Sequence, residues 1–585
     1  MALSEGATPR RPRPPDATPL RRFTRGTAFP RGVKWFGVRS FWGHLRHFLA
    51  AAIATEDVDS RDWMTPDAPL ELLEHVSREL GGKSGATSLL EALERDVWID
   101  FIADTGDDSA VSRATAQLLF APYELPDPDR PGETLLAPRG DILLFGGDTA
   151  YPVATAQEIT NRVVVPFNQV LDALPRDDRR RVLLAIPGNH DWYDGLDGFA
   201  RLFRRRAPGD IEARPSLVGV SQVMLEHYAD WAREFVRGGK IEKPHTLVLD
   251  GYTPVQNASY FVLPISDRIQ LLAVDRQLRT PDSRQRLFLM GHYQDHPELA
   301  TWMLLPDPLY RFGVASQSGT AMLESLRIDL GAHDHFLLSG DVHHYQRLEE
   351  ERLLHVIAGG GGAFLHPARM VDGGLPSQKS WPDARQSRSL LGQAPWKIAA
   401  GRSGILPHLV LLALYVPGMA FGMSLYKKLG FILSAPVATT LVLGTIFALI
   451  GGVRRRKSVL PLAFTAAAIT ALLPVFSSLL LVHVFRELGV TATAALVALL
   501  TLGVSIFLGT YVFGAYLTLL TRFGFEHTQA FTALDHPGFK HFLRLRVRGD
   551  GLGIDGYCIG LADPLGRPDD PLLVDTFQWR PKTRP

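Results

Sequence analysis

A chain of 585 residues is too long for one ordinary hydrophobic core, so several domains or a membrane part are expected. The formal net charge of +1 provides no general basic excess to neutralise many phosphates, which argues against a dedicated nucleic-acid binder. Cys558 is the only cysteine, which excludes an intramolecular disulfide and any metal cluster held by cysteines, so a metal would need oxygen and nitrogen ligands.

The first 95 residues divide into a tail and a helical segment. Residues 1–35 are rich in Pro and Arg and offer too little apolar surface to offset ordering entropy, which predicts a disordered tail. The tail has no apolar core of signal-peptide length. Residues 36–95 are predicted to form a helical N-terminal segment. Within it, the apolar spacing over Val38–Thr55 fits either a core-packing helix or a helix lying on a membrane surface.

Between Val97 and Phe364 short apolar runs alternate with helix-like segments. This pattern is typical of an α/β fold, and we assign residues 96–400 to that domain. Several of the runs end in Asp, Asn or His. Polar side chains at the carboxyl ends of strands lie where open α/β sheets bind ligands.

From Leu406 the sequence changes to four long and nearly uncharged apolar stretches: Leu409–Tyr426, Leu429–Gly452, Val459–Phe485 and Ala492–Leu520. Each is long enough for a helix to span the hydrocarbon core of a membrane. Residues 405–521 are therefore predicted to be a transmembrane region with four helices, in a multi-pass integral membrane protein.

The orientation of the chain in the membrane is predicted from the basic run Arg454–Lys457. This run lies between the second and third apolar stretches and predicts a cytoplasmic loop there. Lys427 and Lys428 in the first loop oppose this orientation but are outnumbered. With four spans, both ends of the chain then share the cytoplasmic side, including the α/β domain. Residues 522–585 alternate apolar and polar residues between Gly-Asp turns, which predicts a small cytosolic β-rich segment.

Four short polar segments follow apolar runs and carry the candidate chemistry: Asp104-Thr105-Gly106, Gly147-Asp148-Thr149-Ala150-Tyr151, Gly188-Asn189-His190-Asp191 and Gly340-Asp341-Val342-His343-His344-Tyr345. Two cations about 3.5–4 Å apart need a bridging ligand, usually a carboxylate, and Asp148 is the candidate. Oxygen donors with imidazole suit Fe, Mn or Zn. Each segment alone could be a helix cap or a turn, but their common position after strand-like runs favours one site.

These segments resemble the calcineurin-like metallophosphoesterase superfamily, whose blocks run D-x-H or D-x-G, G-D-x-x, G-N-H-D/E and G-H-x-H. The tyrosine in GDTAY looks like the purple acid phosphatase version, and SGDVH resembles a phrase of PhoD-like alkaline phosphatases. The longer phrases GNHDWYDGL, SGDVHHYQR and AGGGGAFLHP resemble a membrane-associated group. The resemblance covers about residues 95–370 and implies a β-sandwich flanked by helices.

The resemblance also implies a role for each matching residue. One metal ion would be held by Asp104, Asp148, Tyr151 and His343, and the other by Asp148, Asn189 and Asp341. His190 would contact the phosphoryl group and protonate the leaving oxygen, oriented by Asp191. Substrate contacts are expected from His344 and Tyr345.

Two departures from the family pattern concern the second metal ion. Asp341 stands where the family has a histidine, although a carboxylate is still a competent ligand for a hard metal. The isolated histidine of the family has no secure match, and the candidates are His292, His296 and Asp307. Separately, Gly359–Gly362 fit either backbone contact with a phosphate or close packing of a strand and a turn.

The function expected from these features is a metal-dependent phosphoesterase, anchored in a membrane, that hydrolyses a phosphate mono- or diester at a dinuclear centre. The alternative is a catalytically degraded phosphoesterase that acts as a membrane-bound phosphate sensor or scaffold, which the missing histidine favours. Transport by the apolar helices is less favoured, because they lack the carboxylates or arginines that mark ion pathways.

Overall fold

The computed structural model describes residues 22–23, 31–38, 40, 42, 65–175, 179–205, 246–277, 280–424, 429–453, 456–489, 493–566 and 571–582, with backbone alone for 418–424 and 429–434. Most of the predicted tail and of the helix predicted over Val38–Thr55 lies outside these residues. Arg454 and Arg455 of the orienting run, and Lys427 and Lys428, lie outside them too.

The α/β part of the chain contains two mixed sheets of seven strands each. In the first sheet the order is β18-β17-β16-β1-β4-β5-β6, and in the second it is β15-β13-β14-β12-β9-β8-β7. The first sheet consists of β1 (Val97–Ile102), β4 (Ile142–Phe145), β5 (Arg181–Ala185), β6 (Tyr252–Pro254), β16 (Lys540–Val547), β17 (Ile554–Leu561) and β18 (Leu572–Trp579). The second consists of β7 (Phe261–Pro264), β8 (Ile269–Ala273), β9 (Ala300–Leu305), β12 (His335–Ser339), β13 (Tyr345–Glu350), β14 (Leu353–Ala358) and β15 (Lys379–Trp381).

The two sheets face each other, and helices cover their outer faces. In β1, Ile99 and Phe101 pack into the core between the sheets, whereas Trp98 and Ile102 pack under helices, as the alternation of side chains along a strand requires. The first sheet is covered by α4 (Ser109–Phe120), α5 (Ala156–Ile159), η3 (Thr160–Val164), α6 (Val165–Ala173) and α8 (Asp197–Phe203). The second is covered by α10 (Ser283–Asp295) and α11 (Gln317–Ser325). The predicted α/β sandwich flanked by helices is confirmed.

Shorter elements complete the α/β part. Helix α2 (Pro69–Leu80) buries Leu72, Leu73 and Val76 in the core between the sheets, and α3 (Leu89–Leu93) follows it. Two hairpins are formed by β2 (Tyr123–Pro126) with β3 (Thr134–Ala137), and by β10 (Tyr310–Arg311) with β11 (Val314–Ala315). Helix α7 (Asn189–Trp192) starts just beyond β5.

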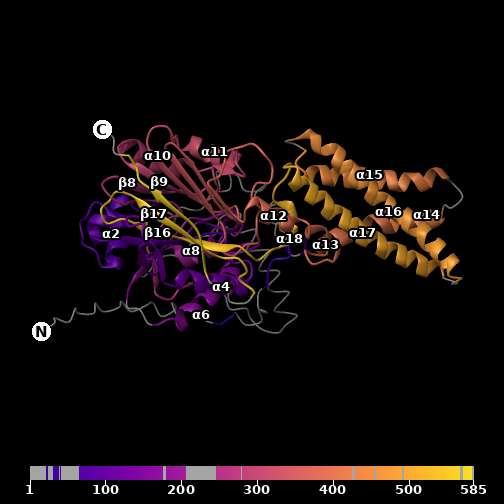
Figure 1. Cartoon of the computed structure of the whole chain (residues 1–585), viewed down its shortest axis with the longest axis horizontal. Coiled ribbons are helices and arrows are strands. Elements are labelled where there is room, and N and C mark those ends of the chain that lie inside the picture. The colour runs from indigo at the N-terminus through magenta and orange to yellow at the C-terminus, as the bar shows by residue number, and fades with distance from the viewer. Residues whose placement is uncertain are drawn as a thin grey trace.

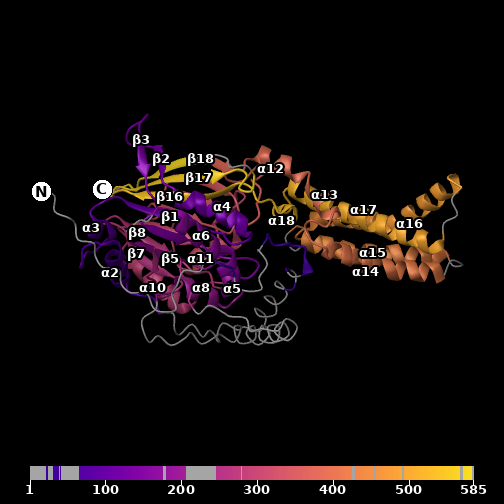
Figure 2. The ribbon, with the colours of Figure 1, turned by 90° about the horizontal axis from the view of Figure 1, so that it is seen from below.

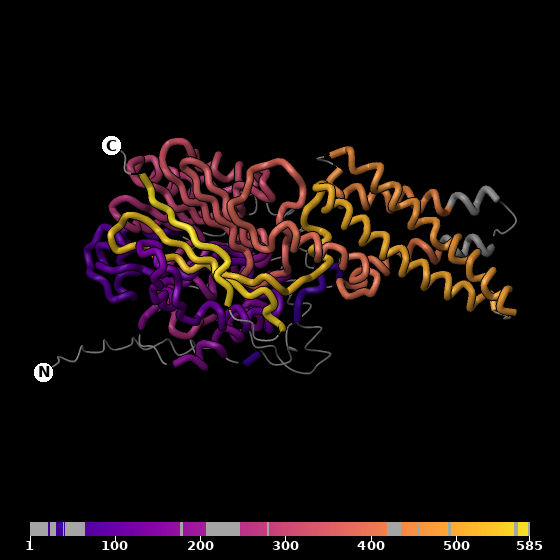
Figure 3. The backbone as a smooth tube through the Cα atoms, viewed as in Figure 1, coloured from indigo at the N-terminus to yellow at the C-terminus, as the bar shows by residue number. Residues whose placement is uncertain are grey.

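The C-terminal strands are present as predicted, but they do not form a separate structural unit. Strand β16 pairs antiparallel with β1, in the register Ile99↔Leu545, and β17 and β18 extend the same sheet. Figure 2 shows these strands beside β1, and Figure 3 follows the chain out into the long helices and back to this sheet. The end of the helical region predicted at residue 521 agrees with the end of α17 at Arg522, but the prediction of a separate β-rich segment is corrected, because residues 540–579 complete the first sheet.

Four long helices project from one end of the α/β part (Figure 1): α14 (Leu406–Ser424), α15 (Leu429–Ile450), α16 (Leu460–Glu487) and α17 (Ala494–Arg522). At the junction lie η4 (Lys457–Val459), α12 (Ala384–Leu391), α13 (Ala394–Ala399) and α18 (Gln529–Leu534). Each predicted span thus corresponds to a helix.

Two helical stretches, Lys457–Glu487 and Ala494–Arg522, are long and apolar enough to cross a membrane. Only 17% and 28% of their apolar windows are buried, so they are unlike core helices of a soluble domain. In α14 and α15 the apolar stretches found are the shorter Leu406–Pro417 and Ala435–Ile450. Within the described residues the predicted count of four spans is therefore not supported, and two candidates remain.

Candidate metal centre

The candidate site is a cavity of about 350 Å³ at the carboxyl ends of parallel strands in both sheets. Six of the predicted site residues line it: Asp148, Tyr151, Asn189, His190, Asp341 and His343. The loops after β1, β4, β5 and β12 position these side chains and Asp104. Ligand sites occur at this edge of α/β sheets because loops from several strands meet there.

Asp148, Tyr151 and His343 line the cavity, and Asp104 lies directly behind them, against Tyr151 and His343. The Tyr151 hydroxyl lies 2.9 Å from Asp104 Oδ1, 3.2 Å from Asp148 Oδ2 and 3.2 Å from His343 Nε2. His343 Nε2 is also 3.4 Å from Asp104 Oδ1. All four side chains are buried. The structure thus brings together the four residues that the sequence assigned to the first metal ion.

The orientation of His343 suits a metal ligand. Its Nδ1 is 2.7 Å from the carbonyl oxygen of Phe364, which can only accept a hydrogen bond, so Nδ1 carries the proton. In the neutral ring Nε2 then presents a lone pair toward Asp104 and Tyr151. Metal-binding histidines commonly have their other ring nitrogen fixed in this way.

The backbone at three of the predicted carboxylate ligands is unusual. Asp104, Asp148 and Asp341 have φ values of 57°, 51° and 65°, in the left-handed region that residues other than glycine rarely adopt. Interlocking hydrogen bonds hold these turns: Asp341 N donates to Asp104 Oδ2 at 2.8 Å, and His190 N donates to Asp148 Oδ1 at 2.8 Å. Strained backbone that the surrounding structure enforces is concentrated at functional sites.

The electrostatics of this cluster fit a bound cation. Burial, followed by repulsion from Asp104 and Asp191, raises the pKa of Asp148 well above its usual value. Burial, followed by repulsion from Asp104 and Asp148, raises the pKa of Tyr151 well above its usual value. Among the ion pairs of the described residues, none joins Asp104 or Asp148 to a lysine or arginine. Because buried carboxylates are normally paired or metal-bound, the four residues fit a metal ion of the Fe, Mn or Zn type.

His190 lies beside the cluster, but its orienting group differs from the prediction. The ring is 4.5 Å from that of Tyr151, and Nδ1 donates to the carbonyl oxygen of Pro152 at 2.7 Å. Asp191, predicted to orient His190, instead accepts from the backbone N–H groups of Gly188 at 2.8 Å and Thr149 at 3.2 Å. Burial raises the pKa of Asp191 to about 6. Asp191 therefore ties two site loops together.

The residues predicted for the second metal ion do not fit one equally well. The Asn189 amide donates to the Tyr193 hydroxyl at 2.6 Å, and Asp341 is ion-paired with Arg311. Asp307 follows β9 at the site edge of its sheet, but it is ion-paired with Arg276 and Arg311.

The two other candidate ligands, His292 and His296, lie at the opposite edge of the second sheet, where α10 leads into the amino end of β9. Neither histidine lines the cavity. Among the residues that the structure describes, the second metal ion therefore has no complete ligand set, and the predicted dinuclear centre is not supported.

The predicted substrate contacts His344 and Tyr345 do not line the cavity either. Both are fully buried at the start of β13. His344 Nδ1 donates to the carbonyl oxygen of Pro367 at 2.8 Å, and the Tyr345 hydroxyl donates to Asp575 of β18 at 2.8 Å. The structure therefore places neither predicted substrate contact at the cavity, because both side chains are held in the interior by Pro367 and Asp575.

The glycine run 359–362 serves close packing. A Cβ at Gly361 would lie 2.4 Å from the Ala103 carbonyl oxygen, and one at Gly359 would lie 2.6 Å from Asp104 Oδ2. Gly361 N also donates to the Ala103 carbonyl oxygen at 2.9 Å. These glycines let the loop after β14 lie against the loop that carries Asp104.

Several residues that line the cavity were not predicted: Trp35, Phe36, Phe364, His366, Gln529 and Thr532. The ring of His366 stacks on that of His343 with centroids 4.1 Å apart. His366 belongs to the motif AGGGGAFLHP, so the sequence did contain a signal for it. Gln529 and Thr532 carried no signal, because only the return of the C-terminal segment brings them to the site.

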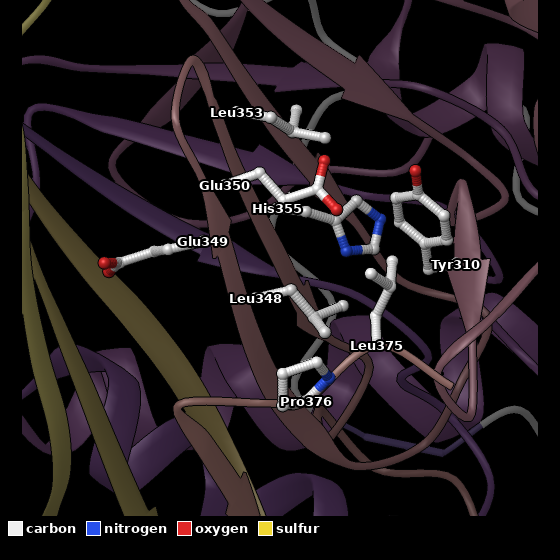
Figure 4. Close-up of a pocket in the computed structure, with 8 residues that line it drawn as sticks. All are labelled: Tyr310, Leu348, Glu349, Glu350, Leu353, His355, Leu375 and Pro376. Carbon is white, nitrogen blue, oxygen red and sulfur yellow. The ribbon is translucent and has the colours of Figure 1, made fainter. Parts of the chain in front are cut away.

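Two further features lie apart from this cavity. Asp67, Glu71 and His75 place their ligand atoms within 4.8 Å of one another, but Arg205 contacts all three, so they form an ion-pair network. A second cavity of about 160 Å³ is shown in Figure 4, where the ring of His355 lies between Tyr310 and Glu350.

Comparisons with known proteins show little. No protein-family model and no curated protein matches the sequence. Among solved structures, "GAP50 the anchor in the inner membrane complex of Plasmodium" is similar at 10% identity and a TM-score of 0.29, covering 49% of this chain and 78% of that one. "Structure of PhoD" is similar at 10% identity and a TM-score of 0.23, covering 46% and 58%. Similarities this low support no further argument.

Proposed function

We propose that this chain is a metal-dependent phosphoesterase that hydrolyses a phosphate mono- or diester and is held at a membrane by its long apolar helices. One observation carries the proposal. The buried side chains of Asp104, Asp148, Tyr151 and His343 meet at the cavity, which the last three line, and the two carboxylates have no ion pair with a lysine or arginine in the part of the chain that the structure describes. Such a donor set is suited to a metal ion that activates water and polarises a phosphoryl oxygen.

The remaining cavity residues supply proton transfer and positioning. The Pro152 carbonyl oxygen accepts from Nδ1 of His190, so in the doubly protonated ring Nε2 would be the atom that gives its proton to the leaving oxygen of the ester. His366 accepts from the backbone N–H of His343 and stacks on its ring, which keeps His343 in its ligand orientation. Asp191 holds the two loops that carry Asp148 and His190.

The position of the cavity supports a substrate presented at a membrane surface. Trp35 packs on Tyr151 with ring centroids 5.7 Å apart, and the next residue, Phe36, packs on Phe513 of α17 at 6.0 Å. Helix α18, which lines the cavity, starts seven residues after α17 ends. One side of the cavity thus lies at the base of the apolar helices, within reach of a phosphate ester in the headgroup region.

A second candidate function is a phosphate sensor or scaffold that does not turn over its ligand. The ion pairs of Asp307 and Asp341 with arginines favour it, because they leave the second metal ion without free carboxylates. The intact first set of four ligands opposes it.

The test is phosphate release from generic mono- and diester substrates by the purified full chain, supplied in turn with Mn, Fe or Zn. We expect turnover that depends on metal and falls on the order of a hundredfold or more in Asp148→Asn. The matched control is Asp129→Asn, since Asp129 is exposed and pairs with Arg548 away from the cavity. Phosphate binding without turnover by metal-loaded protein would favour the sensor, and a chain that neither binds metal nor turns over any ester would refute the phosphoesterase.

A further inference from the structure

Two arginines lie on the second-metal side of the cavity. Arg276 follows β8 and pairs with Asp307 Oδ2. Arg311, in β10, pairs with Asp341 Oδ2 and lies 3.5 Å from Asp307 Oδ1, so one guanidinium connects the two carboxylates. Asp341 itself lines the cavity, so the Arg311 guanidinium is bound to a carboxylate of the cavity wall.

The two halves of the site differ in how their carboxylates are neutralised. Asp307 is buried, and both Asp307 and Asp341 have guanidinium partners. Asp104 and Asp148 have no such ion pair among the described residues, and the buried Lys540 is hydrogen-bonded to the Ala363 carbonyl oxygen instead. Asp104 and Asp148 therefore still require a cation, whereas guanidinium groups already neutralise Asp307 and Asp341.

We propose that Arg276 and Arg311 take the place of a second metal ion, so that the site holds one metal ion and binds the phosphoryl group of its ligand with Arg311. This inference rests on the proposed function for the identity of the ligand. A metal ion between Asp307 and Asp341 would have to displace both guanidinium groups and leave them unpaired in a largely buried position.

Arg311 has the properties that phosphoryl binding needs. Its side chain is 35% exposed, and its Nε is buried and has no hydrogen-bond partner in the structure as described. A guanidinium donates in a planar fork that matches two phosphate oxygens. Arg276 keeps Asp307 neutralised, which lets Arg311 turn from Asp307 toward a ligand without leaving that carboxylate unpaired.

The division of tasks follows from the chemistry of the two cations. A guanidinium neutralises phosphoryl charge, but it does not lower the pKa of a water molecule as a metal ion does. Activation of water would then depend entirely on the metal ion that Asp104 and His343 would hold. The negative charge of the phosphoryl group would be neutralised by that metal ion and by Arg311 together.

The first measurement is the metal content of the full chain after loading with Mn, Fe or Zn and removal of excess, determined by elemental mass spectrometry. We expect one metal ion per chain. Two per chain would overturn the inference. Turnover with two metal ions would leave the phosphoesterase standing, whereas one metal ion without turnover would leave the arginine inference standing.

The second measurement is calorimetric binding of inorganic phosphate to the metal-loaded protein. Arg311→Met should weaken binding by about tenfold or more, because a charge-assisted hydrogen bond is lost, and the metal content should not fall. Arg548→Met, which removes an arginine that pairs with Asp129 and Asp550, should bind as the parent does. Unchanged phosphate affinity in folded Arg311→Met would contradict the assignment. If that variant does not fold, Arg311→Lys is measured instead, with the same two outcomes and loss of the bidentate contact as the expected cause.

Discussion

Arg544 of β16 and Asp100 of β1 form an ion pair in which neither side chain is exposed, with Nε 2.7 Å from Oδ1, although 444 residues separate them. The same guanidinium donates to the carbonyl oxygens of Leu119 and Ala121, at the end of α4. The C-terminal strand is thereby fixed to the strand that leads to Asp104. The fold around the candidate site therefore depends on residues beyond the long helices.

The first prediction concerns this ion pair. Arg544→Met should lower the free energy of unfolding of the α/β part by about 3–5 kcal/mol, because it leaves the Asp100 carboxylate buried without its cation. Tryptophan fluorescence during urea denaturation in detergent measures the change. Arg548→Met breaks pairs with the exposed Asp129 and Asp550 and a longer one with the buried Asp555, which Arg580 still neutralises, so it should cost less than about 1 kcal/mol. Equal effects of the two variants would contradict the structural role of Arg544.

The pairing of β16 with β1 also shows where prediction of the fold from sequence stops. The buried strands β1, β4, β5, β8, β12 and β14 were visible as apolar runs, because both faces of each are covered. The alternation in the C-terminal segment predicted strands, yet nothing local indicates which strand they pair with. The pairing of β16 with β1 joins residues more than 400 positions apart, and the long helices lie between them in the sequence.

The second prediction concerns the glycine run beside Asp104. Gly361→Ala should destabilise the protein and reduce its metal content, because a Cβ there would lie 2.4 Å from the Ala103 carbonyl oxygen and would push the loop that carries Asp104. Thermal unfolding and elemental analysis measure both effects.

Gly291→Ala provides the matched control, since Gly291 lies inside α10 and a Cβ there would meet nothing within 4 Å. It should raise the stability by about 0.5–1 kcal/mol, because alanine has a higher helix propensity than glycine. If Gly361→Ala and Gly291→Ala had the same stability and metal content, close packing would not explain the glycine run 359–362.

The site was predictable to the extent that its ligands follow strand ends. The position of their motifs after apolar runs indicated one common site, and the resemblance to metallophosphoesterases implied Asp104, Asp148, Tyr151 and His343 as ligands of one metal ion. Arg276 directly follows the Asp that ends the run IQLLAVD, so a signal existed, but the sequence does not reveal that its partner is Asp307. His344 and Tyr345 were misassigned because motif proximity does not specify which way a side chain points.

The third prediction tests whether Tyr151 is a ligand. Burial and the neighbouring carboxylates raise the pKa of Tyr151 well above 10, so its hydroxyl is protonated at pH 7 and must lose that proton to bind a metal ion. On metal binding, Tyr151→Phe should therefore release about one proton fewer than the parent, measured by calorimetry in buffers of different ionisation enthalpy. Tyr345→Phe removes an equally buried hydroxyl that donates to Asp575, and it should release as many protons as the parent.

The fourth prediction concerns pH and the cavity in Figure 4. Both ring nitrogens of His355 are buried and lack a hydrogen-bond partner within the described structure, and burial lowers the pKa of His355 to about 3. The unfolded chain takes up a proton near pH 6.5, whereas the folded chain does so only near pH 3, so acid favours unfolding across that window. His355→Leu should remove this sensitivity and gain about 2 kcal/mol relative to the parent between pH 7 and pH 5.

Urea denaturation of the parent and the variant at the two pH values measures the difference. His296→Gln is the control, because His296 is 44% exposed and its ring is already in water in the folded chain. The sign is the decisive feature: a group with a lowered folded pKa contributes stability above its unfolded pKa and loses it as pH falls. A stability difference between parent and His355→Leu that stayed constant from pH 7 to pH 5 would show that the imidazole can take up a proton in place, and hence that water or a ligand reaches this cavity.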